Sequence, residues 1–539
     1  MELLAKDAGI LGMDEVLKQI KVVSPYGLQI KRELKPFKPA EREALGEALD
    51  RLEIFVKAMK RQPDVFSSLR SRLSHLKEIS ESLSNASQDM ALSQVELFEV
   101  KGVILLIKAV ASQYGAFLKQ LPDNFHMQVP EETDRALDPT GEGMESFYLS
   151  DSYSEQLAAV REKLKETEKT LKVYRQNVIL GVMADYGALR FRPNGVAIIA
   201  KSDRRLYEQL RGDLRLMVVD EHYETVSFGV VANSEMEVVI REIEALKWEE
   251  EQETYTVRLK LSQIIASELN RFRWSLNALG ELDLYVAKAA LAIGVNGVKP
   301  ELVGTGEGIH IEEGRHIGVE IRLRREQKGY TPVTVRFDTP VSLITGANMG
   351  GKTIALKMIG LCVAMAHYGL YVPAVQLKTP ILDFLIAVIG DEQSIDKGLS
   401  TFGSEVVALI KALDQGDREG LILIDELARG TNPAEGAALS KSIVEYMSSK
   451  AAYSVITTHY DGIAAPDNHQ VRRWQVKGLK QLSDIASLAA QMDYRLEPVE
   501  CCETVPHDAL RIAELLGLPK VIVDRAYIFL HHEEAKSAE

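Results

Sequence analysis

The segment that most constrains this chain is LITGANMGGKTIAL, residues 343–356, in which a glycine-rich loop joins an apolar run to a helical pattern. Gly346, Gly351, Lys352 and Thr353 fit the spacing G-x-x-x-x-G-K-[ST] of a P-loop, or Walker A motif. Glycine allows the backbone angles with which successive N–H groups face one anion, and the following helix adds the positive end of its dipole. The segment therefore predicts a strand, loop and helix that hold the phosphates of a nucleotide.

Every residue of this loop is a candidate ligand of the nucleotide. In a P-loop the lysine reaches the β- and γ-phosphates and the hydroxyl after it binds magnesium, so ATP and Mg²⁺ are the expected cofactors. The predicted cofactor-binding residues of the loop are Gly346, Ala347, Asn348, Met349, Gly350, Gly351, Lys352 and Thr353.

A second motif, LILIDE, is an apolar run that ends in two carboxylates, Asp425 and Glu426. This is the pattern of a Walker B strand. Asp425 is predicted to hold magnesium, through water, and Glu426 to orient or deprotonate the attacking water. Two acids at the end of a strand are a weak signal alone. Together with the loop, they predict an ATPase in which Lys352 and Glu426 are catalytic.

The second half of the sequence has the pattern of an α/β domain. Beyond Pro300, amphipathic helical segments separate most of the short apolar runs, as in a largely parallel sheet whose strands are buried on both faces. The runs expected to be strands are VTVRF, VSLIT, FLIAVIG, GLILID and YSVITTH. We expect this domain to span residues 299–539, after an N-terminal segment of residues 1–40.

The region between these segments, residues 41–298, is predicted to be helical. Apolar residues recur at steps of three and four from Leu157 to Val178, and again from Leu261 to Val286, as on the seam of long paired helices. Between these stripes, β-branched runs surround the turn signal Pro193-Asn194-Gly195. We therefore expect a small β-containing insertion at about residues 182–252.

Composition excludes several classes of protein. The chain is 46% hydrophobic and 26% charged, which is ordinary for a globular protein, and it lacks the run of roughly 18 apolar residues that a membrane span needs. Its first residues lack the basic end and apolar centre of a signal peptide, so we expect a cytoplasmic location. Cys362, Cys501 and Cys502 are too few for a disulfide framework. A net charge of −14 still permits a local basic surface.

The residues around the two motifs resemble a known family. In order and spacing, TGANMGGKT, IGDEQSIDKGLSTFGSE, LILIDELARGTNPAEGAALS and TTHY resemble the ATPase domain of the MutS proteins. CCETVPHDALRIAELLGLPKVIVDRA is similar to the helical dimerisation end of that domain, at about residues 504–535, and LGELDLYVAKAALA to the close of the lever helices. GDEQSIDKGLSTF and GTNPAEGAALS most resemble the Smr-bearing MutS relatives, which act on recombination intermediates or stalled ribosomes rather than mismatches.

The resemblance implies a fold and an assembly. The expected fold is an ABC-type P-loop NTPase domain preceded by an all-α lever domain with a clamp insertion, and the expected assembly is a homodimer with two composite ATP sites. Ser400 and Thr401 match the family segment that reaches the γ-phosphate bound by the partner. His459 matches the residue that couples hydrolysis to domain motion, and Gln393 a position near the metal and nucleotide. From the residues alone, Ser400 is equally a helix cap and His459 a strand-end residue.

The chain departs from the family pattern in ways that affect the expectation. Ala347 stands where the family usually has proline, and Ala428 where it has glycine in the DELARGT segment. Neither change removes a phosphate or metal ligand, so we expect altered rates with binding retained. About 40 residues precede the helical region and little follows the ATPase motifs, so we expect neither the mismatch-recognition domain nor the Smr nuclease domain.

The β insertion corresponds by position to the MutS clamp, which closes around DNA through phosphate contacts. Its basic residues are the low-specificity candidates for nucleic-acid contact. They are Arg190, Arg192, Lys201, Arg204, Arg205, Arg211 and Arg215, interspersed with Asp203, Glu208 and Asp213. The alternating charges are equally compatible with surface ion pairs that bind nothing.

Two functions remain open from the sequence. The first is an ATP-gated dimer that binds branched or otherwise non-B DNA through the clamp. The second is a motor that remodels a protein partner without binding nucleic acid, because short MutS-like ATPases resemble the component proposed to reactivate lysine 5,6-aminomutase. In that case the acidic helix at residues 235–253 would be a docking face. Neither function involves a membrane.

Overall fold

The structure is a computed structural model in two compact units. Unit 1 comprises Met1–His75, Gln120–Phe125 and Leu279–Glu539, and unit 2 comprises Leu76–Lys119 and His126–Ala278. The structure describes the chain except residues 4, 140, 142, 144–145, 188, 347–350, 390–400, 429–431, 461–462, 464–467, 480–491, 500–509, 511–512, 515–516 and 538–539.

Unit 1 is built on a seven-stranded sheet with the strand order β1-β10-β11-β12-β8-β13-β14. All neighbouring strands in it are parallel except the β13–β14 pair. Its strands are β1 (Glu2–Leu3), β8 (Val341–Thr345), β10 (Phe384–Val388), β11 (Gly420–Ile424), β12 (Tyr453–Thr457), β13 (Val471–Leu479) and β14 (Met492–Pro498). Four of the five runs expected to be strands are the central strands of this sheet.

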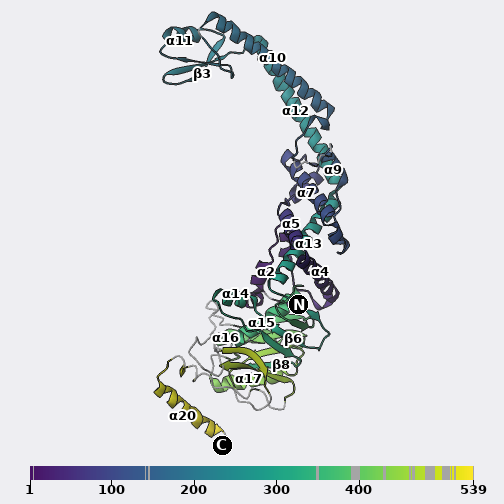
Figure 1. Cartoon of the computed structure of the whole chain (residues 1–539), viewed down its shortest axis with the longest axis vertical. Helices are drawn as coiled ribbons and strands as arrows, with labels where there is room; N and C mark the ends of the chain where they lie inside the picture. Colours follow the sequence, from purple (N-terminus) through teal and green to yellow (C-terminus); the bar gives the residue numbers. More distant parts are fainter. Residues whose placement is uncertain are drawn as a thin grey trace. The chain divides into compact units, whose positions relative to one another are not determined.

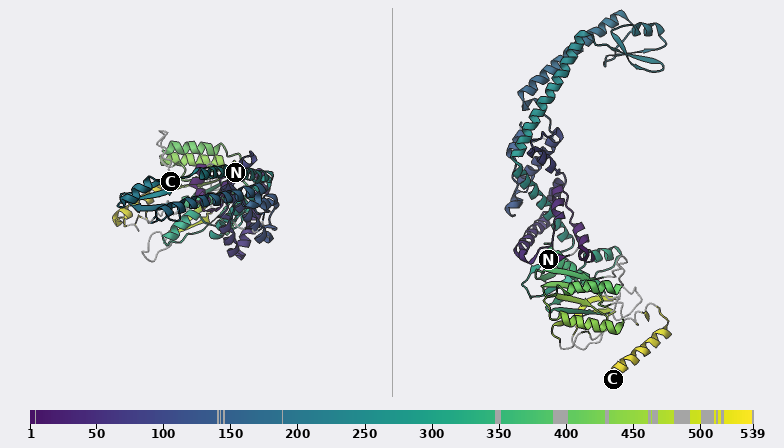
Figure 2. Two further views of the ribbon diagram at one scale, coloured as in Figure 1. Left: turned by 90° about the horizontal axis from the view of Figure 1, so that it is seen from above. Right: turned by 180° about the vertical axis from the view of Figure 1, so that it is seen from behind.

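Helices cover both faces of the sheet, which explains why its central strands are mostly apolar and largely buried (Figure 2). Leu421 and Leu423 of β11 face a core shared with α15 (Lys352–His367), while Ile422 and Ile424 face another. The second core is shared with α16 (Thr401–Leu413) and α17 (Pro433–Met447). After the last strand, the described part of the chain contains α20 (Lys520–Ser537).

The prediction for the run VTVRF was wrong in one respect, because its strand belongs to a different sheet. β7 (Val333–Phe337) pairs antiparallel with β6 (Ile309–Gly314) in a four-stranded sheet of order β5-β9-β6-β7. This sheet also contains β5 (Glu301–Leu302) and β9 (Gln376–Thr379), and α14 (Ile317–Arg325) follows β6. Thr334 and Arg336 are exposed between buried neighbours, so the run alternates as a half-exposed strand does.

The N-terminal residues are part of unit 1. β1 pairs with β10 and is itself the edge strand of the sheet, and Leu11, Met13 and Val16 are buried in the core that contains α15. Asp283 of α13 (Leu269–Gly294) accepts hydrogen bonds from the backbone N–H groups of Val23 and Ser24 and from the Ser24 hydroxyl, at 2.6–3.2 Å. The helices here are α1 (Ala5–Ile10), α2 (Met13–Gln19), α3 (Pro25–Arg32), α4 (Arg42–Arg61) and α5 (Pro63–Leu73).

Unit 2 contains a pair of long helices that carry a small sheet. α10 (Glu155–Asp185) and α12 (Ser234–Ser267) lie side by side in both views (Figures 1 and 2). Between them in the sequence, β2 (Val196–Ala200), β3 (Leu216–Glu221) and β4 (Thr225–Val230) form an antiparallel sheet of order β2-β4-β3, with α11 (Arg204–Arg211) before β3. This unit also contains α6 (Ser80–Ser87), α7 (Gln94–Gln113), α8 (Gly115–Leu118), α9 (Glu131–Leu137) and the first part of α13.

The second apolar stripe does not form one continuous helix as the sequence predicts. α12 ends at Ser267 and α13 begins at Leu269, with Glu268 between them at φ −108° and ψ 17°. The buried Glu268 carboxylate accepts hydrogen bonds from the backbone N–H and the hydroxyl of Thr133, at 2.8 and 2.9 Å. Glu268 therefore combines a local break in the helix with a tertiary contact that a periodicity argument does not detect.

Among the helices in the described ranges, none combines the length and the apolar character that crossing a membrane requires.

His367, the last residue of α15, makes stability depend on pH. Its ring is fully buried, Nδ1 donates to the Val363 carbonyl at 2.8 Å, and Nε2 accepts from the Leu382 N–H at 2.9 Å. Desolvation by burial lowers the pKa of His367 from 6.5 to about 4. Below pH 6.5, His367 binds a proton in the unfolded chain but stays neutral in the folded chain. The free energy of unfolding therefore falls as the pH drops toward 4.

We expect His367→Gln to remove this dependence, because glutamine also donates and accepts but does not titrate. Between pH 7.5 and pH 5.0, the wild type should lose about 2 kcal/mol more unfolding free energy than the variant does. Urea unfolding at both pH values measures the difference. Parallel pH profiles for the two proteins would show that His367 is not the responsible group.

Candidate nucleotide site

The candidate site forms where three neighbouring parallel strands end at one edge of the sheet. β12 lies between β8 and β11, with Thr457 in register with Ile344 and Ile456 in register with Ile424. The phosphate loop follows β8, the two carboxylates follow β11, and His459 follows β12. The order of the strands therefore brings together motifs that lie far apart in the sequence. They meet at the edge of the sheet where open α/β folds bind ligands.

Both described ends of the phosphate loop have the backbone geometry that a loop of this kind requires. Gly346 has φ 128°, and Gly351 has φ 81° as the N-cap of α15. These are left-handed backbone angles that glycine adopts without the clash of a side chain. The amino terminus of α15 thus opens directly from the loop, as a phosphate site at a helix N-terminus needs.

Lys352 is buried at the base of the loop. Its Nζ donates to the Gly346 carbonyl at 2.5 Å, which ties the two ends of the loop together. Burial lowers the pKa of Lys352, whereas the nearby carboxylates of Glu426 and Asp425 raise it. The ammonium group is therefore shielded from solvent and lies near two carboxylates that favour its charged form.

The Asp425 carboxylate connects all three strand ends. One oxygen accepts a hydrogen bond from the Thr353 hydroxyl at 2.7 Å, and the other accepts from the Thr457 hydroxyl at 2.6 Å. The Thr457 hydroxyl in turn accepts from the backbone N–H of Glu426 at 2.8 Å. Thr353 and Asp425 thus present two facing oxygens, which is the donor chemistry that Mg²⁺ prefers, so the residues present fit a magnesium ion.

The turn after β11 is strained. Glu426 has φ 50° and Ala428 has φ 62°, and both are residues for which a left-handed backbone is unfavourable. The backbone N–H of Ala428 donates to Oε1 of Glu405 in α16 at 3.1 Å. Ala428 is the position at which glycine is expected from the family pattern, and its positive φ supplies the physical reason for that glycine.

His459 lies beyond the end of β12 and is exposed. Its ring is 4.1 Å from the Tyr460 ring, between centroids, at an interplanar angle of 41°. The backbone N–H of Thr458 donates to the Ile344 carbonyl at 3.1 Å, which fixes this segment beside the strand that precedes the phosphate loop. An exposed imidazole at this edge is available to contact a ligand or another element.

Several of the predicted ligands fall outside the residues that the structure describes. These are Ala347, Asn348, Met349 and Gly350 of the loop, with Gln393 and Ser400. Thr401 is the first residue of α16. The structure accordingly brings together Gly346, Gly351, Lys352, Thr353, Asp425 and Glu426.

Three residues of the site carry no role that the sequence alone predicts. Thr457 lies in the TTHY segment, but its double hydrogen bond depends on the order of the strands. Glu405 acts from α16 on the turn after β11. Tyr494 of β14 packs against the loop, since a Cβ atom on Gly351 would lie 2.9 Å from its Cδ1. No local sequence signal connects Tyr494 or Glu405 to the nucleotide motifs.

The basic residues of the small sheet in unit 2 differ in how they are engaged. Arg215 pairs with Asp213 and Asp185 at 2.7 Å, and this guanidinium lowers the pKa of Asp213. Lys201 pairs with Glu221 at 2.6 Å. These three ion pairs match the alternative interpretation of the alternating charges as surface ion pairs.

The other basic residues of this sheet are exposed. Arg190 donates to the carbonyls of Gly187 and Leu189, and Arg211 lies over the Tyr207 ring at 5.9 Å from its centroid. Arg204 and Arg205 open α11, and neither they nor Arg192 form an ion pair with an acidic residue in the described part of the chain. These five arginines are therefore not part of the ion pairs that Lys201 and Arg215 form.

Comparison with known proteins agrees with this geometry. Residues 342–533, which contain the phosphate loop and the Asp425 turn, match the family model MutS domain V. The chain is also similar to proteins named endonuclease MutS2. It is 30% identical to that of Pelotomaculum thermopropionicum over 482 residues, which are 86% of this chain and 57% of the relative.

Two further relatives carry the same name. The protein of Symbiobacterium thermophilum is 32% identical over 431 residues, 78% of this chain and 50% of the relative. That of Thermomicrobium roseum is 31% identical over 413 residues, 73% of this chain and 48% of the relative. The chain thus spans about half the length of the curated relatives that it matches. These matches support membership of the MutS family.

The strain at Ala428 is open to a direct test. Replacing Ala428 with glycine should raise the unfolding free energy by about 0.5–1 kcal/mol, because relief of the left-handed clash exceeds the added entropy of the unfolded chain. Ala438→Gly, at a position inside α17, is the matched control and should lower it by about 1 kcal/mol. Chemical denaturation measures both. Equal losses for the two variants would contradict the assignment of strain.

Proposed function

Taking the chain as a member of the MutS family, we propose that it is a Mg²⁺-dependent ATPase that acts as a homodimer on DNA. The observation that carries the ATPase part is the Asp425 carboxylate held between the hydroxyls of Thr353 and Thr457, at the mouth of a glycine-capped loop. In this proposal residues 299–539 are the ABC-type ATPase domain. Residues 41–298 are a lever domain with a clamp at about 182–252.

Phosphate binding is the function of the loop and of the helix that follows it. The N-terminal N–H groups of α15 point out of the sheet edge, and glycine at positions 346 and 351 leaves room for the backbone to approach an anion. Lys352 would exchange the Gly346 carbonyl for the β- and γ-phosphate oxygens. The half-buried Tyr494 ring beside Gly351 would bound the same space on one side.

Thr353 and Asp425 would hold magnesium, the second through water. When bound, magnesium supplies positive charge that stabilises the charge developing on the phosphate oxygens. The Thr457 hydroxyl keeps the Asp425 carboxylate in place and accepts from the Glu426 backbone, so it positions both acids. Glu426 would then orient or deprotonate the water that attacks the γ-phosphate.

Residues from the partner chain would complete the site. Ser400 and Thr401 are proposed to contact the nucleotide of the other protomer, Gln393 to lie near the metal, and His459 to couple hydrolysis to motion of the lever. Thr401 starts α16, the same helix whose Glu405 holds the turn after β11. A residue that contacts the partner's nucleotide is therefore one helical turn from a residue that orders this chain's own acidic turn.

The proposed DNA contact rests on the exposed arginines of the small sheet. Phosphate backbone contacts need positive charge that is not already neutralised, which favours Arg192, Arg204, Arg205 and Arg211 over Lys201 and Arg215. The relatives are named endonucleases, a name that fits nucleic acid better than a protein partner. We propose branched or otherwise non-B DNA as the substrate.

Two substitutions separate nucleotide binding from hydrolysis. Lys352→Ala should abolish detectable ATP binding, because it removes the cation at the base of the loop that would hold the β- and γ-phosphates. Glu426→Gln should keep ATP affinity within about threefold and reduce turnover by at least about a hundredfold. Fluorescent-nucleotide titration and phosphate release measure the two quantities. Normal turnover by Glu426→Gln would assign the base to another residue.

The clamp proposal predicts a change in salt dependence. For Arg204→Gln with Arg205→Gln, the slope of log affinity against log salt on duplex or branched DNA should fall by about 0.9 for each phosphate that the variant no longer neutralises. Lys201→Gln removes a charge from the same sheet that is already paired with Glu221, and should leave the slope nearly unchanged. Fluorescence anisotropy at several salt concentrations gives the slopes. Identical slopes for all three proteins would count against DNA contact at α11.

A further inference from the structure

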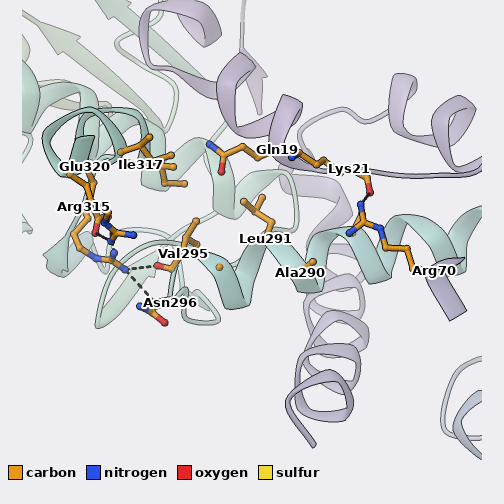
Figure 3. A pocket seen from close by; sticks show the side chains of 14 residues that line it. Gln19, Lys21, Arg70, Ala290, Leu291, Val295, Asn296, Arg315, Ile317 and Glu320 are labelled. Atoms are coloured by element: carbon orange, nitrogen blue, oxygen red, sulfur yellow. Dashed lines mark hydrogen bonds and ion pairs between the residues drawn. The ribbon is translucent and has the colours of Figure 1, made fainter. Parts of the chain in front are cut away.

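A pocket of about 430 Å³ lies in unit 1 (Figure 3). Its walls come from the end of α2 and the residue Lys21 after it, from α5, from the second half of α13, from α14, and from residues that follow α13 or precede α14. This volume is in the range of pockets that bind small molecules. None of the residues that line it belongs to the nucleotide motifs.

The floor of the pocket is apolar. α13 contributes Ala287, Ala290 and Leu291, the chain after it contributes Val295, and α14 contributes Ile317. Small side chains at positions 287 and 290 leave the surface of α13 open, so the concavity is a property of the sequence of this helix. An apolar floor of this kind favours a ligand with an apolar or aromatic part.

The polar residues of the pocket are predominantly basic. Lys21, Arg70, Arg315 and Arg324 line it, against one acidic residue, Glu320. Arg315 and Arg324 both pair with Glu320, at 2.8 and 3.2 Å. The single carboxylate is therefore already neutralised, and the pocket keeps an excess of positive charge.

The basic groups are placed at two ends of the floor. Figure 3 shows Arg315 and Glu320 at one end and Lys21 and Arg70 at the other, with Leu291 and Ala290 between them. Arg315 also donates to the Val295 carbonyl at 2.6 Å, so its guanidinium is engaged in hydrogen bonds within the pocket wall. At the other end Arg70 donates to the Lys21 carbonyl at 2.9 Å, and no acidic residue among the described lining residues lies at that end.

We propose that this pocket binds a small organic phosphate, with its phosphate group at the Lys21–Arg70 end and an apolar or aromatic body on the α13 floor. The hydrogen bond to the Lys21 carbonyl uses one nitrogen of the Arg70 guanidinium and orients the group, which leaves other donors for an anion. A guanidinium held in this way matches the geometry of phosphate oxygens and loses little freedom on binding.

The test uses the full-length chain and phenyl phosphate as the probe, observed by saturation-transfer NMR and calorimetry. Phenyl phosphate carries both the anion and the flat body that the pocket would accept. Inorganic phosphate lacks the body, and benzyl alcohol lacks the charge, so both should bind more weakly. Benzoate distinguishes a carboxylate ligand from a phosphate ligand, and we expect it to bind more weakly than phenyl phosphate.

Variants assign the binding to this pocket, because the phosphate loop is itself an anion site in the proposed function. Arg70→Gln and Lys21→Gln should each weaken phenyl phosphate binding by at least about tenfold. Ala290→Phe should do the same by filling the floor while every charge remains. Arg322→Gln, in α14 but outside the pocket lining, is the matched control and should bind as the wild type does.

Lys21 is exposed, so Lys21→Gln should fold normally even if Arg70→Gln does not. Absence of phenyl phosphate binding, or binding that Lys21→Gln and Ala290→Phe leave unchanged, would overturn the proposal. Equal affinity for inorganic phosphate would remove the requirement for an organic body, and tighter binding of benzoate would remove the assignment to phosphate. The measurement does not involve ATP hydrolysis. A negative result would therefore overturn the pocket proposal without bearing on the proposed ATPase function.

Discussion

The interaction on which the site depends is the pair of hydrogen bonds that the Asp425 carboxylate accepts from Thr353 and Thr457. Thr353 belongs to the helix after β8, Thr457 ends β12, and Asp425 follows β11, so one side chain connects three neighbouring strand ends. Hydrogen bonds to a charged group are worth about 1.5–3 kcal/mol each, and both hydroxyls are held by regular secondary structure. The sheet therefore fixes the distance between the phosphate loop and the acidic turn. This distance does not depend on the conformation of the loops that connect the strands.

The acidic turn shows how the fold maintains an unfavourable backbone. Left-handed angles at Glu426 and Ala428 cost about 1–2 kcal/mol each, and such strain persists only where neighbouring groups hold it. The Glu426 N–H is held by Thr457 and the Ala428 N–H by Glu405. The second of these hydrogen bonds links the acidic turn to α16, the helix that begins at Thr401.

Unit 1 includes segments that lie far in the sequence from the nucleotide-binding motifs. β1 extends the central sheet at β10, α2 packs in the core beneath α15, and Asp283 holds the start of α3 through the backbone of Val23 and Ser24. A buried carboxylate that accepts several hydrogen bonds is specific in direction as well as favourable in energy. The same arrangement brings Lys21 and Arg70 to the surface of α13, where they form one end of the basic pocket.

The sequence by itself determined the strand and the helix on either side of the glycine-rich loop, the acidic end of β11, the long helix α10 with its apolar stripe, and the small β insertion that follows it. Each depends on residues close together in the chain: glycine where φ is positive, apolar residues at the period of a helix, and a Pro-Asn-Gly turn. Predictions from the sequence were wrong where contacts between distant residues determine the structure. The run VTVRF could be assigned to its antiparallel sheet only from its partner β6, and the break at Glu268 only from the contact with Thr133. Only the tertiary structure decided the roles of Thr457, Glu405 and Tyr494 and the pocket on α13. The order of the strands and the packing of the helices bring these distant residues together, and no local sequence pattern encodes either of them.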